Sequence, residues 1–112
     1  MDSFNALSHA VHCSAHYDIY EGRIQFKYGD RRQYLYKIGE KLKRGGNDAG
    51  NQDFKIVKAY GILENDICPI CNEKNDLSEF DVYIENGIIT KVQKMANIDD
   101  YLTDLQNFKV LG

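Results

Sequence analysis

Three cysteines and one histidine are the residues of this chain best suited to chemistry. Cys68 and Cys71 flank Pro69-Ile70, and this C-x2-C spacing lets two thiolates converge on one ion while nearby backbone amides stabilise the sulfur charge. Cys13 and His16 repeat the spacing as C-x2-H. Together the four side chains would complete a closed Cys3His tetrahedron, so the sequence predicts a structural Zn²⁺ site.

Other interpretations of these residues stay open. His12 could replace His16 as the nitrogen ligand, although the x2 spacing favours His16. Cys68 and Cys71 could instead be ordinary reduced thiols, since free cysteine packs as a small hydrophobe, or a thiol redox pair of the C-P-x-C kind. Such a redox pair usually stands at the start of a helix, and the polar segment 72–76 has no apolar stripe that predicts one.

Catalytic motifs are missing from the sequence. It contains no H-E-x-x-H, P-loop or G-x-G-x-x-G pattern, no paired-carboxylate signature and no Ser/His/Asp arrangement. A closed four-ligand zinc also leaves no coordination position for a substrate. We therefore expect a protein that is not an enzyme.

A basic stretch between residues 23 and 44 is a second candidate surface. Aromatic residues interleave with its charges, which is the composition of a single-strand nucleic-acid platform. Alternation with a period of two nevertheless places several of these rings on the face expected to form the core, which leaves the charges on a solvated face. The candidate contacts for nucleic acid or a protein partner are Arg23, Lys27, Arg31, Arg32, Lys43 and Arg44, and the interleaved rings are Phe26, Tyr28, Tyr34 and Tyr36.

Length and composition fit a single zinc-stapled domain spanning residues 1–112. The chain is 43% hydrophobic with a net charge of −3, which argues against attraction of the whole molecule to nucleic acid or anionic lipid. The charge is unevenly distributed, because the segment 23–58 is basic and the segment 59–87 is acidic. No apolar run approaches the roughly 18 residues that cross a bilayer, and the first ten residues do not resemble a signal peptide, so a cytoplasmic protein without a membrane partner is expected.

The elements that must position the candidate ligands are mostly strands. Alternation predicts a strand over residues 23–28, an antiparallel partner over 33–38 joined by Gly29-Asp30, and a third, central strand over 54–63. Two further strands, over 80–85 and 88–95, flank Asn86-Gly87, which is the preferred dipeptide of a two-residue hairpin turn.

A helical period is found only near the two ends of the chain. Apolar residues at positions 98, 101, 102, 105 and 108 follow Asn97, which could cap a helix, and predict an amphipathic C-terminal helix. Phe4, Leu7 and Val11 behind Ser3 give a weaker helical signal at the N-terminus.

The two ligand pairs, with strands between them, resemble a zinc ribbon, a family of small β modules in which paired ligands on two turns hold one zinc. The runs 24–30 and 45–48 are also similar to a group of small, uncharacterised bacterial proteins that carry such knuckles. The resemblance covers residues 11–95 and implies a zinc held by Cys13, His16, Cys68 and Cys71. It departs from the ribbon pattern at His16, where cysteine is usual, and in the 51 residues between the two pairs.

The expected fold is mainly β (α+β): an antiparallel sheet of about five strands with a zinc-ribbon-like metal site and a C-terminal helix. Zinc ribbons serve nucleic-acid binding and protein docking alike. Net acidity, the charge distribution and eight tyrosines suit a complementary protein surface, so we expect a protein–protein interaction module, such as an adaptor, inhibitor or immunity-type partner. Nucleic-acid binding through the basic stretch and thiol redox at Cys68 and Cys71 are the alternatives.

Overall fold

Strands make up all the regular structure in the part of the chain that the structure describes. A computed structural model describes residues 5–15, 19–30, 34–43, 48–49, 55–76, 78–95 and 108–111. The strands in these ranges are β1 (Asn5–His12), β2 (Ile19–Phe26), β3 (Gly29–Asp30), β4 (Leu35–Tyr36), β5 (Asp48–Ala49), β6 (Ile56–Leu63), β7 (Glu79–Glu85), β8 (Ile88–Lys94) and β9 (Phe108–Val110).

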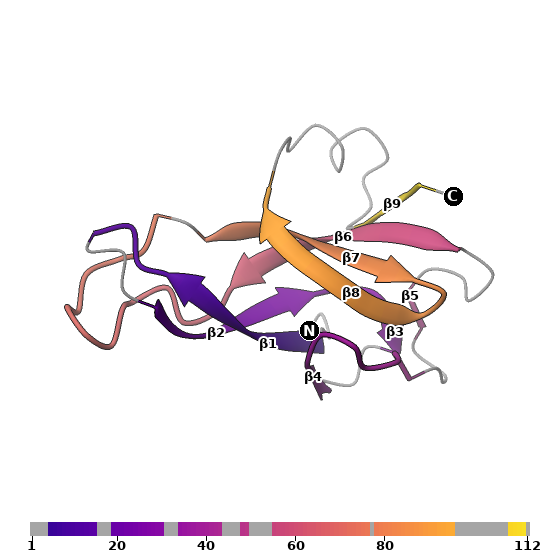
Figure 1. Ribbon diagram of the computed structural model, residues 1–112, viewed down its shortest axis with the longest axis horizontal. Helices are drawn as coiled ribbons and strands as arrows, with labels where there is room; N and C mark the ends of the chain where they lie inside the picture. The colour runs from indigo at the N-terminus through magenta and orange to yellow at the C-terminus, as the bar shows by residue number, and fades with distance from the viewer. Residues whose placement is uncertain are drawn as a thin grey trace.

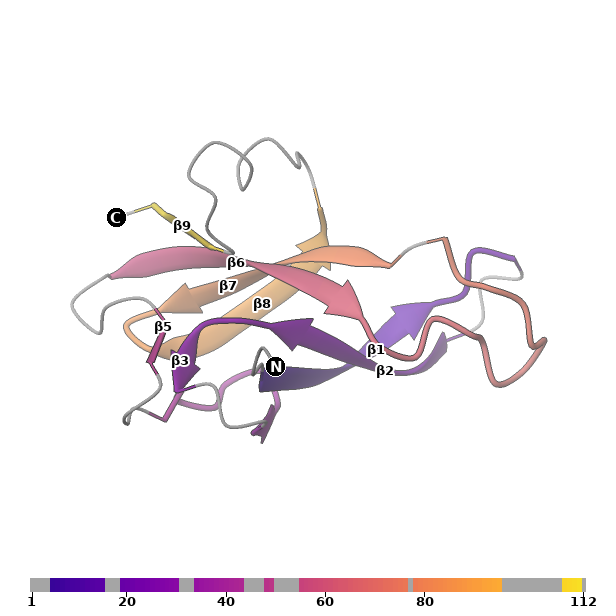
Figure 2. The ribbon, with the colours of Figure 1, turned by 180° about the vertical axis from the view of Figure 1, so that it is seen from behind.

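Seven of these strands form one curled sheet. Its order is β4-β1-β2-β6-β7-β8, with β9 paired to β6, while β3 and β5 form a separate two-stranded sheet. The β1–β4 pair is parallel, and the other pairs of the large sheet are antiparallel. The sheet curls until the β1–β2 side lies across from the β7–β8 side, which gives an incomplete barrel (Figure 1, Figure 2).

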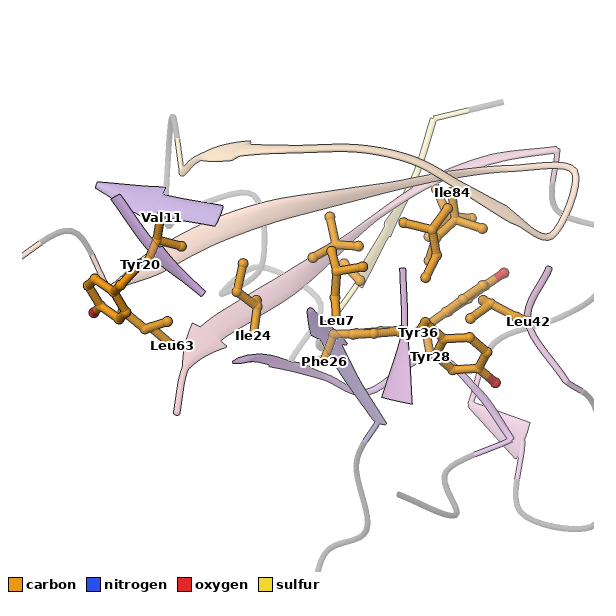
Figure 3. Close-up of a cluster of buried hydrophobic side chains, with 14 of the residues drawn as sticks. Leu7, Val11, Tyr20, Ile24, Phe26, Tyr28, Tyr36, Leu42, Leu63 and Ile84 are labelled. Atoms are coloured by element: carbon orange, nitrogen blue, oxygen red, sulfur yellow. The ribbon is translucent and has the colours of Figure 1, made fainter. Parts of the chain in front are cut away.

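The hydrophobic core fills the concave side of this sheet. Alternation along β2 and β6 directs every second side chain inward, and the inward side chains of both strands are buried. Leu7 and Ile24 are register partners on β1 and β2 and are both 0% exposed. Figure 3 shows the rings of Phe26 and Tyr36 in the same cluster, with centroids 6.2 Å apart.

Two glycines allow the curled strands to approach closely. A Cβ at Gly61 would lie 2.7 Å from Cγ2 of Ile24, and a Cβ at Gly22 would lie 2.8 Å from Cγ1 of Val11. Real carbon atoms do not pack that closely, so a side chain at either position would displace its buried neighbours on the adjacent strand.

A short segment after β4 joins the two edges of the sheet at one end. β4 pairs with β1, and residues 39–42 then reach β8 on the opposite edge. Gly39 donates its N–H to the Ile89 carbonyl at 2.7 Å, and Leu42 donates to Gly87 at 2.7 Å. The barrel is therefore closed at this end by the segment 34–42.

Two of the predicted elements are confirmed. The central strand is β6, which has β2 and β9 on one side and β7 on the other. The hairpin is β7–β8, and its turn residues Asn86 and Gly87 have φ values of 52° and 79°. Left-handed values at both positions are what a type I′ turn requires, and Asn-Gly adopts them readily.

The hairpin predicted over residues 23–38 is wrong. Residues 23–26 belong to β2, but β1 and β6 occupy its two edges. Leu35 and Tyr36 instead run parallel to β1 on its other side. Gly29 and Asp30 do not turn the chain back on itself, because they form β3 and pair with β5. Alternation identifies which face of a strand is buried, but it does not identify the neighbour.

The predicted C-terminal helix is also wrong, and the fold is all-β in the described residues, with more strands than the five expected. Phe108, the last apolar position of that helix, begins β9, which pairs with residues 57–59 of β6. β2 pairs with β6 only at Leu63 and Ile62, so β9 fills the edge of β6 that β2 leaves open. The Phe108 ring also packs on Tyr28, with centroids 5.1 Å apart. Residues 98–107 lie outside the described ranges.

The weak helical signal at the N-terminus belongs to a strand. Leu7 and Val11 are both buried in β1. Their separation of four residues places them on one face of a helix and equally on one face of a strand, so the spacing alone could not distinguish the two. Phe4 lies outside the described residues.

Candidate metal centre

The three cysteines come together at one end of the sheet. Cys13 directly follows β1, whereas Cys68 and Cys71 lie in the loop between β6 and β7. Their Sγ atoms all lie within 4.8 Å of one another, and the sulfurs of Cys13 and Cys71 are 3.8 Å apart. A tetrahedron with Zn–S bonds of about 2.3 Å has edges of about 3.8 Å. The sulfur spacing therefore suits a tetrahedral thiolate-bound ion.

The loop that carries Cys68 and Cys71 is a tight hairpin, and we call residues 66–75 the knuckle. A bridge pairs Ile67 with Lys74, and the N–H of Cys68 donates to the carbonyl of Glu73 at 2.9 Å. These bonds fix the two cysteines relative to each other although no long strand runs through the knuckle.

Backbone donors inside the knuckle point toward sulfur. The N–H of Ile70 lies 3.4 Å from Sγ of Cys68, and the backbone of Glu73 hydrogen-bonds to Cys71. The N–H of Asn72 donates instead to the Cys68 carbonyl at 2.8 Å. Asn72 takes the left-handed conformation, with φ of 60°, that turns the chain back. N–H groups aimed at sulfur stabilise the thiolate form that binds metal, as the C-x2-C spacing predicted.

Asn75 holds the Cys13 segment against the knuckle. Its side-chain oxygen accepts the N–H of Ser14 at 3.1 Å, and its Nδ2 donates to the carbonyl of His12 at 2.8 Å. Nδ2 also lies 3.3 Å from the hydroxyl of Tyr20, and Asn75 is 0% exposed. The two residues that flank Cys13 are thus fixed by one buried amide.

Asn65 anchors the start of the same loop to β2. Its side-chain oxygen accepts the N–H of Arg23 at 2.8 Å, and its Nδ2 donates to the carbonyl of Glu21 at 2.9 Å. The hydroxyl of Tyr20 donates to the Asn65 carbonyl at 3.0 Å. Sequence analysis missed both asparagines, because their partners lie more than forty residues away along the chain.

Crowding of the three thiols changes the acidity of Cys71. The backbone of Glu73 acts to lower its pKa, but lost solvation and the neighbouring sulfurs of Cys13 and Cys68 outweigh that effect and raise the pKa above the ordinary value of the thiol. A bound cation would oppose this effect, because metal-coordinated thiols are deprotonated.

The described residues contribute three thiols and no fourth ligand to this cluster. His12 is exposed and lines a groove beside Phe80. It is not among the clustered ligand atoms, and it is exposed whereas Cys13 is buried. His16 lies outside the described residues.

The candidate contacts in the basic stretch are only partly described. Arg23 forms an ion pair with Glu64 at 3.7 Å, and Nζ of Lys43 lies 4.4 Å from the centroid of the Tyr34 ring. Of the aromatic residues expected to stack on bases, three are buried in the core: Phe26, Tyr28 and Tyr36. Lys27 lies within the described ranges and takes part in an interaction there. Arg31, Arg32 and Arg44 lie outside the described ranges.

No family model, curated protein or solved structure matches this chain. In the described ranges there is no helix of the length and apolar character needed to cross a membrane. The case for a function therefore rests on the residues and their geometry.

Proposed function

We propose that this chain is a non-enzymatic zinc-binding protein whose metal centre stabilises a protein–protein interaction module. The observation that carries the proposal is the cluster of three sulfurs from two distant segments, with spacing that suits a tetrahedral ion. Soft thiolate ligands favour zinc over magnesium or calcium, which prefer oxygen.

His16 completes the proposed ligand set. It follows Cys13 at the same spacing that separates Cys68 from Cys71. His12, the alternative, lies on an exposed face and is not among the clustered ligand atoms. Four protein ligands would close the coordination sphere, so the zinc would support folding instead of activating a substrate.

The proposed partner surface is the exposed outer side of the knuckle. Ile67 and Ile70 are 53% and 57% exposed there. Figure 1 shows the loop between β6 and β7 at the same end of the molecule as the start of β2, whose first residue, Ile19, is 57% exposed. Large apolar side chains held in a rigid loop lose little conformational freedom when they bind a partner. A metal-fixed knuckle is therefore suited to docking on another protein.

The two alternative functions have less support. A single-strand nucleic-acid platform needs accessible rings, whereas Phe26, Tyr28 and Tyr36 are buried. A redox thiol needs a lowered pKa, whereas the pKa of Cys71 is raised.

Elemental analysis of untagged protein, combined with thiol counting before and after a chelator, tests the metal centre. We expect one zinc per chain, with three thiols that react only after the chelator is added. His16→Ala should reduce zinc retention, while the matched variant His12→Ala should keep it. Protein without metal and with three freely reactive thiols would refute the site.

A capture experiment from native lysate tests the interaction role. We expect a protein partner that is retained by the parent chain and lost with Ile70→Asp, a variant that should still bind zinc. Nucleic acid that co-purifies at a constant ratio, with no protein partner, would contradict the proposal.

A further inference from the structure

The incomplete barrel has an opening between β1 and β8, beyond the short stretch of β1 that β4 covers. The opening is a groove of about 260 Å³, lined by residues 9–12 of β1, residues 92–94 of β8, and Phe80. We call it the β1–β8 groove. It lies beyond the end of the barrel that the segment 34–42 closes.

The β1 side of the groove has outward-pointing backbone groups. Ala6 donates its N–H to the Tyr34 carbonyl, so its backbone polar groups point away from β2. Because these directions alternate along a strand, the N–H groups of Ser8 and Ala10 point toward the same edge. Among the described residues β4 pairs with β1 only at Ala6 and Leu7, so beyond them this edge has no strand neighbour.

The β8 side of the groove also has backbone groups that point outward, away from the neighbouring strand. Met95 donates its N–H to the carbonyl of Glu79 on β7, so the backbone groups of Val92 and Lys94 point away from β7. Ile89, nearer the closed end, accepts a hydrogen bond from Gly39 and donates one to Glu40. The segment 34–42 thus occupies the part of the gap between β1 and β8 that lies at the closed end of the barrel, and we call this gap the seam.

We propose that the β1–β8 groove binds an extended segment of another polypeptide, which continues the seam and completes the barrel. β1 and β8 are parallel to each other, because four antiparallel pairings separate them through β2, β6 and β7. A single strand antiparallel to both could therefore bond to both edges. Addition of a strand to an exposed sheet edge is an established mode of peptide recognition.

The side chains around the groove indicate the chemistry of that segment. Val11 is 4% exposed, and Phe80 and Val92 are half-buried, so the groove has an apolar floor. Among the described residues, its polar lining includes Lys94 and His12 and no carboxylate. Lys94 lies two residues after Val92 and so on the same face of β8 as the floor. The segment that fits best therefore combines apolar residues over the floor with acidic residues within reach of the Lys94 ammonium group.

One existing contact must change when the segment binds. The ring of His9 lies 2.8 Å from the carbonyl of Ala10, one of the acceptors on the open edge. This contact protects the edge in the free protein, since exposed strand edges otherwise pair with other chains. Rotation of the ring would release the acceptor.

Amide hydrogen exchange measured by NMR, with and without a probe peptide, tests the inference. The probe is an acetylated heptapeptide of alternating valine and glutamate, and its control replaces each glutamate with lysine. We expect the glutamate probe to protect the amides of Ser8, Ala10, Val92 and Lys94, and the lysine peptide to leave them unprotected. Binding without protection at these four amides, or no binding at millimolar probe, would overturn the inference.

Two matched charge variants test the role of Lys94. Lys94→Glu should weaken binding of the glutamate probe at least about fivefold, while Lys55→Glu, the same change at an exposed position outside the groove, should have a much smaller effect. Equal losses in the two variants would refute the acidic partner. Protection of the four amides in a dimer formed without the probe would identify a second copy of this chain as the occupant and would also overturn the proposal.

The inference rests on the proposed interaction role, which it extends to a second surface, but not on zinc. Zinc content is measured on the same samples, so the two proposals fail separately. Zinc-loaded protein that does not bind the probe would overturn only the proposal about the groove. Metal-free protein that binds the probe with the expected protection would overturn the zinc centre alone.

Discussion

The side-chain oxygen of Asn75 accepts the backbone N–H of Ser14 across 61 residues of sequence, at 3.1 Å. The bond joins the knuckle to the end of β1, beside the buried thiol of Cys13. Asp76 adds a second link, since its N–H donates to the hydroxyl of Ser14 at 2.9 Å. The two halves of the sulfur cluster are therefore aligned by hydrogen bonds that do not require a metal.

Replacing Asn75 should weaken both the fold and the metal centre. Asn75→Ala leaves the Ser14 N–H and the His12 carbonyl without their partner, which should lower the free energy of unfolding by about 2–3 kcal/mol. Zinc affinity should fall by about tenfold or more, because groups that orient ligands commonly contribute that much. Chemical denaturation and competition with a chromophoric chelator measure the two effects.

The exposed amide Gln93 provides the control. Gln93→Ala removes a hydrogen bond to the Tyr83 hydroxyl at the surface and should change stability by less than about 0.5 kcal/mol. Equal costs for the two variants would show that the buried amide does not couple the segments.

Loss of a cysteine ligand should matter only when metal is present. With zinc, Cys68→Ser should melt well below the parent protein, because a tightly bound ligand adds about 4 kcal/mol at a thousandfold excess over its Kd. With a chelator, the two proteins should melt within a few degrees of each other. Thermal melts in both conditions provide the test, and a gap that persists in chelator would mean that Cys68 acts through packing alone.

The raised pKa of Cys71 predicts slow alkylation in metal-free protein. A thiol reacts as its thiolate, so a pKa above the ordinary value reduces the reactive fraction at neutral pH. The rate should be lower than that of a cysteine in an unstructured peptide and should rise about tenfold per pH unit until the pH reaches the pKa. Stopped-flow alkylation across pH 7–10 measures it, and a faster rate than the peptide at pH 7 would revive the redox alternative.

Sequence reasoning succeeded where the signal was local. The dipeptide Asn86-Gly87 by itself favours the left-handed conformations of its turn. The C-x2-C spacing of Cys68 and Cys71 by itself predicts the tight turn of the knuckle. Alternation also located the central strand β6. Each of these features depends on residues only a few positions apart.

The failures concern partners that are distant along the chain. Phe108 matched a helical period, but its structure is decided by the unpaired edge of β6, about fifty residues earlier. Asn75 belonged only to the polar segment 72–76 in the sequence analysis, because its partners Ser14 and His12 are more than sixty residues away along the chain. The same limit applies to the strand order, since alternation does not specify which strands are neighbours.

The tyrosine on the outer face of β6 should titrate abnormally. The pKa of Tyr60 is raised to about 12, first by burial, then by its hydrogen bond to Glu79 at 2.7 Å and by the charge of that carboxylate. Since the neutral phenol is favoured in the folded state, this stabilisation is complete below pH 10 and is lost as the pH rises toward 12. Glu79→Gln should lower the pKa of Tyr60, as measured by NMR of labelled tyrosine rings. An unchanged pKa in this variant would mean that burial alone causes the shift.

A methyl group at Gly61 should be costly because of one neighbour. The new Cβ of Gly61→Ala would lie 2.7 Å from Cγ2 of Ile24 and 3.2 Å from Cγ2 of Val82, so β2 and β6 must separate. Overpacking of this kind costs about 1–3 kcal/mol. If the clash with Ile24 causes the loss, the same change should cost much less in an Ile24→Ala background, and a double-mutant cycle measures that coupling. Additive losses in the two backgrounds would place the strain in the backbone of β6 and not in its contact with β2.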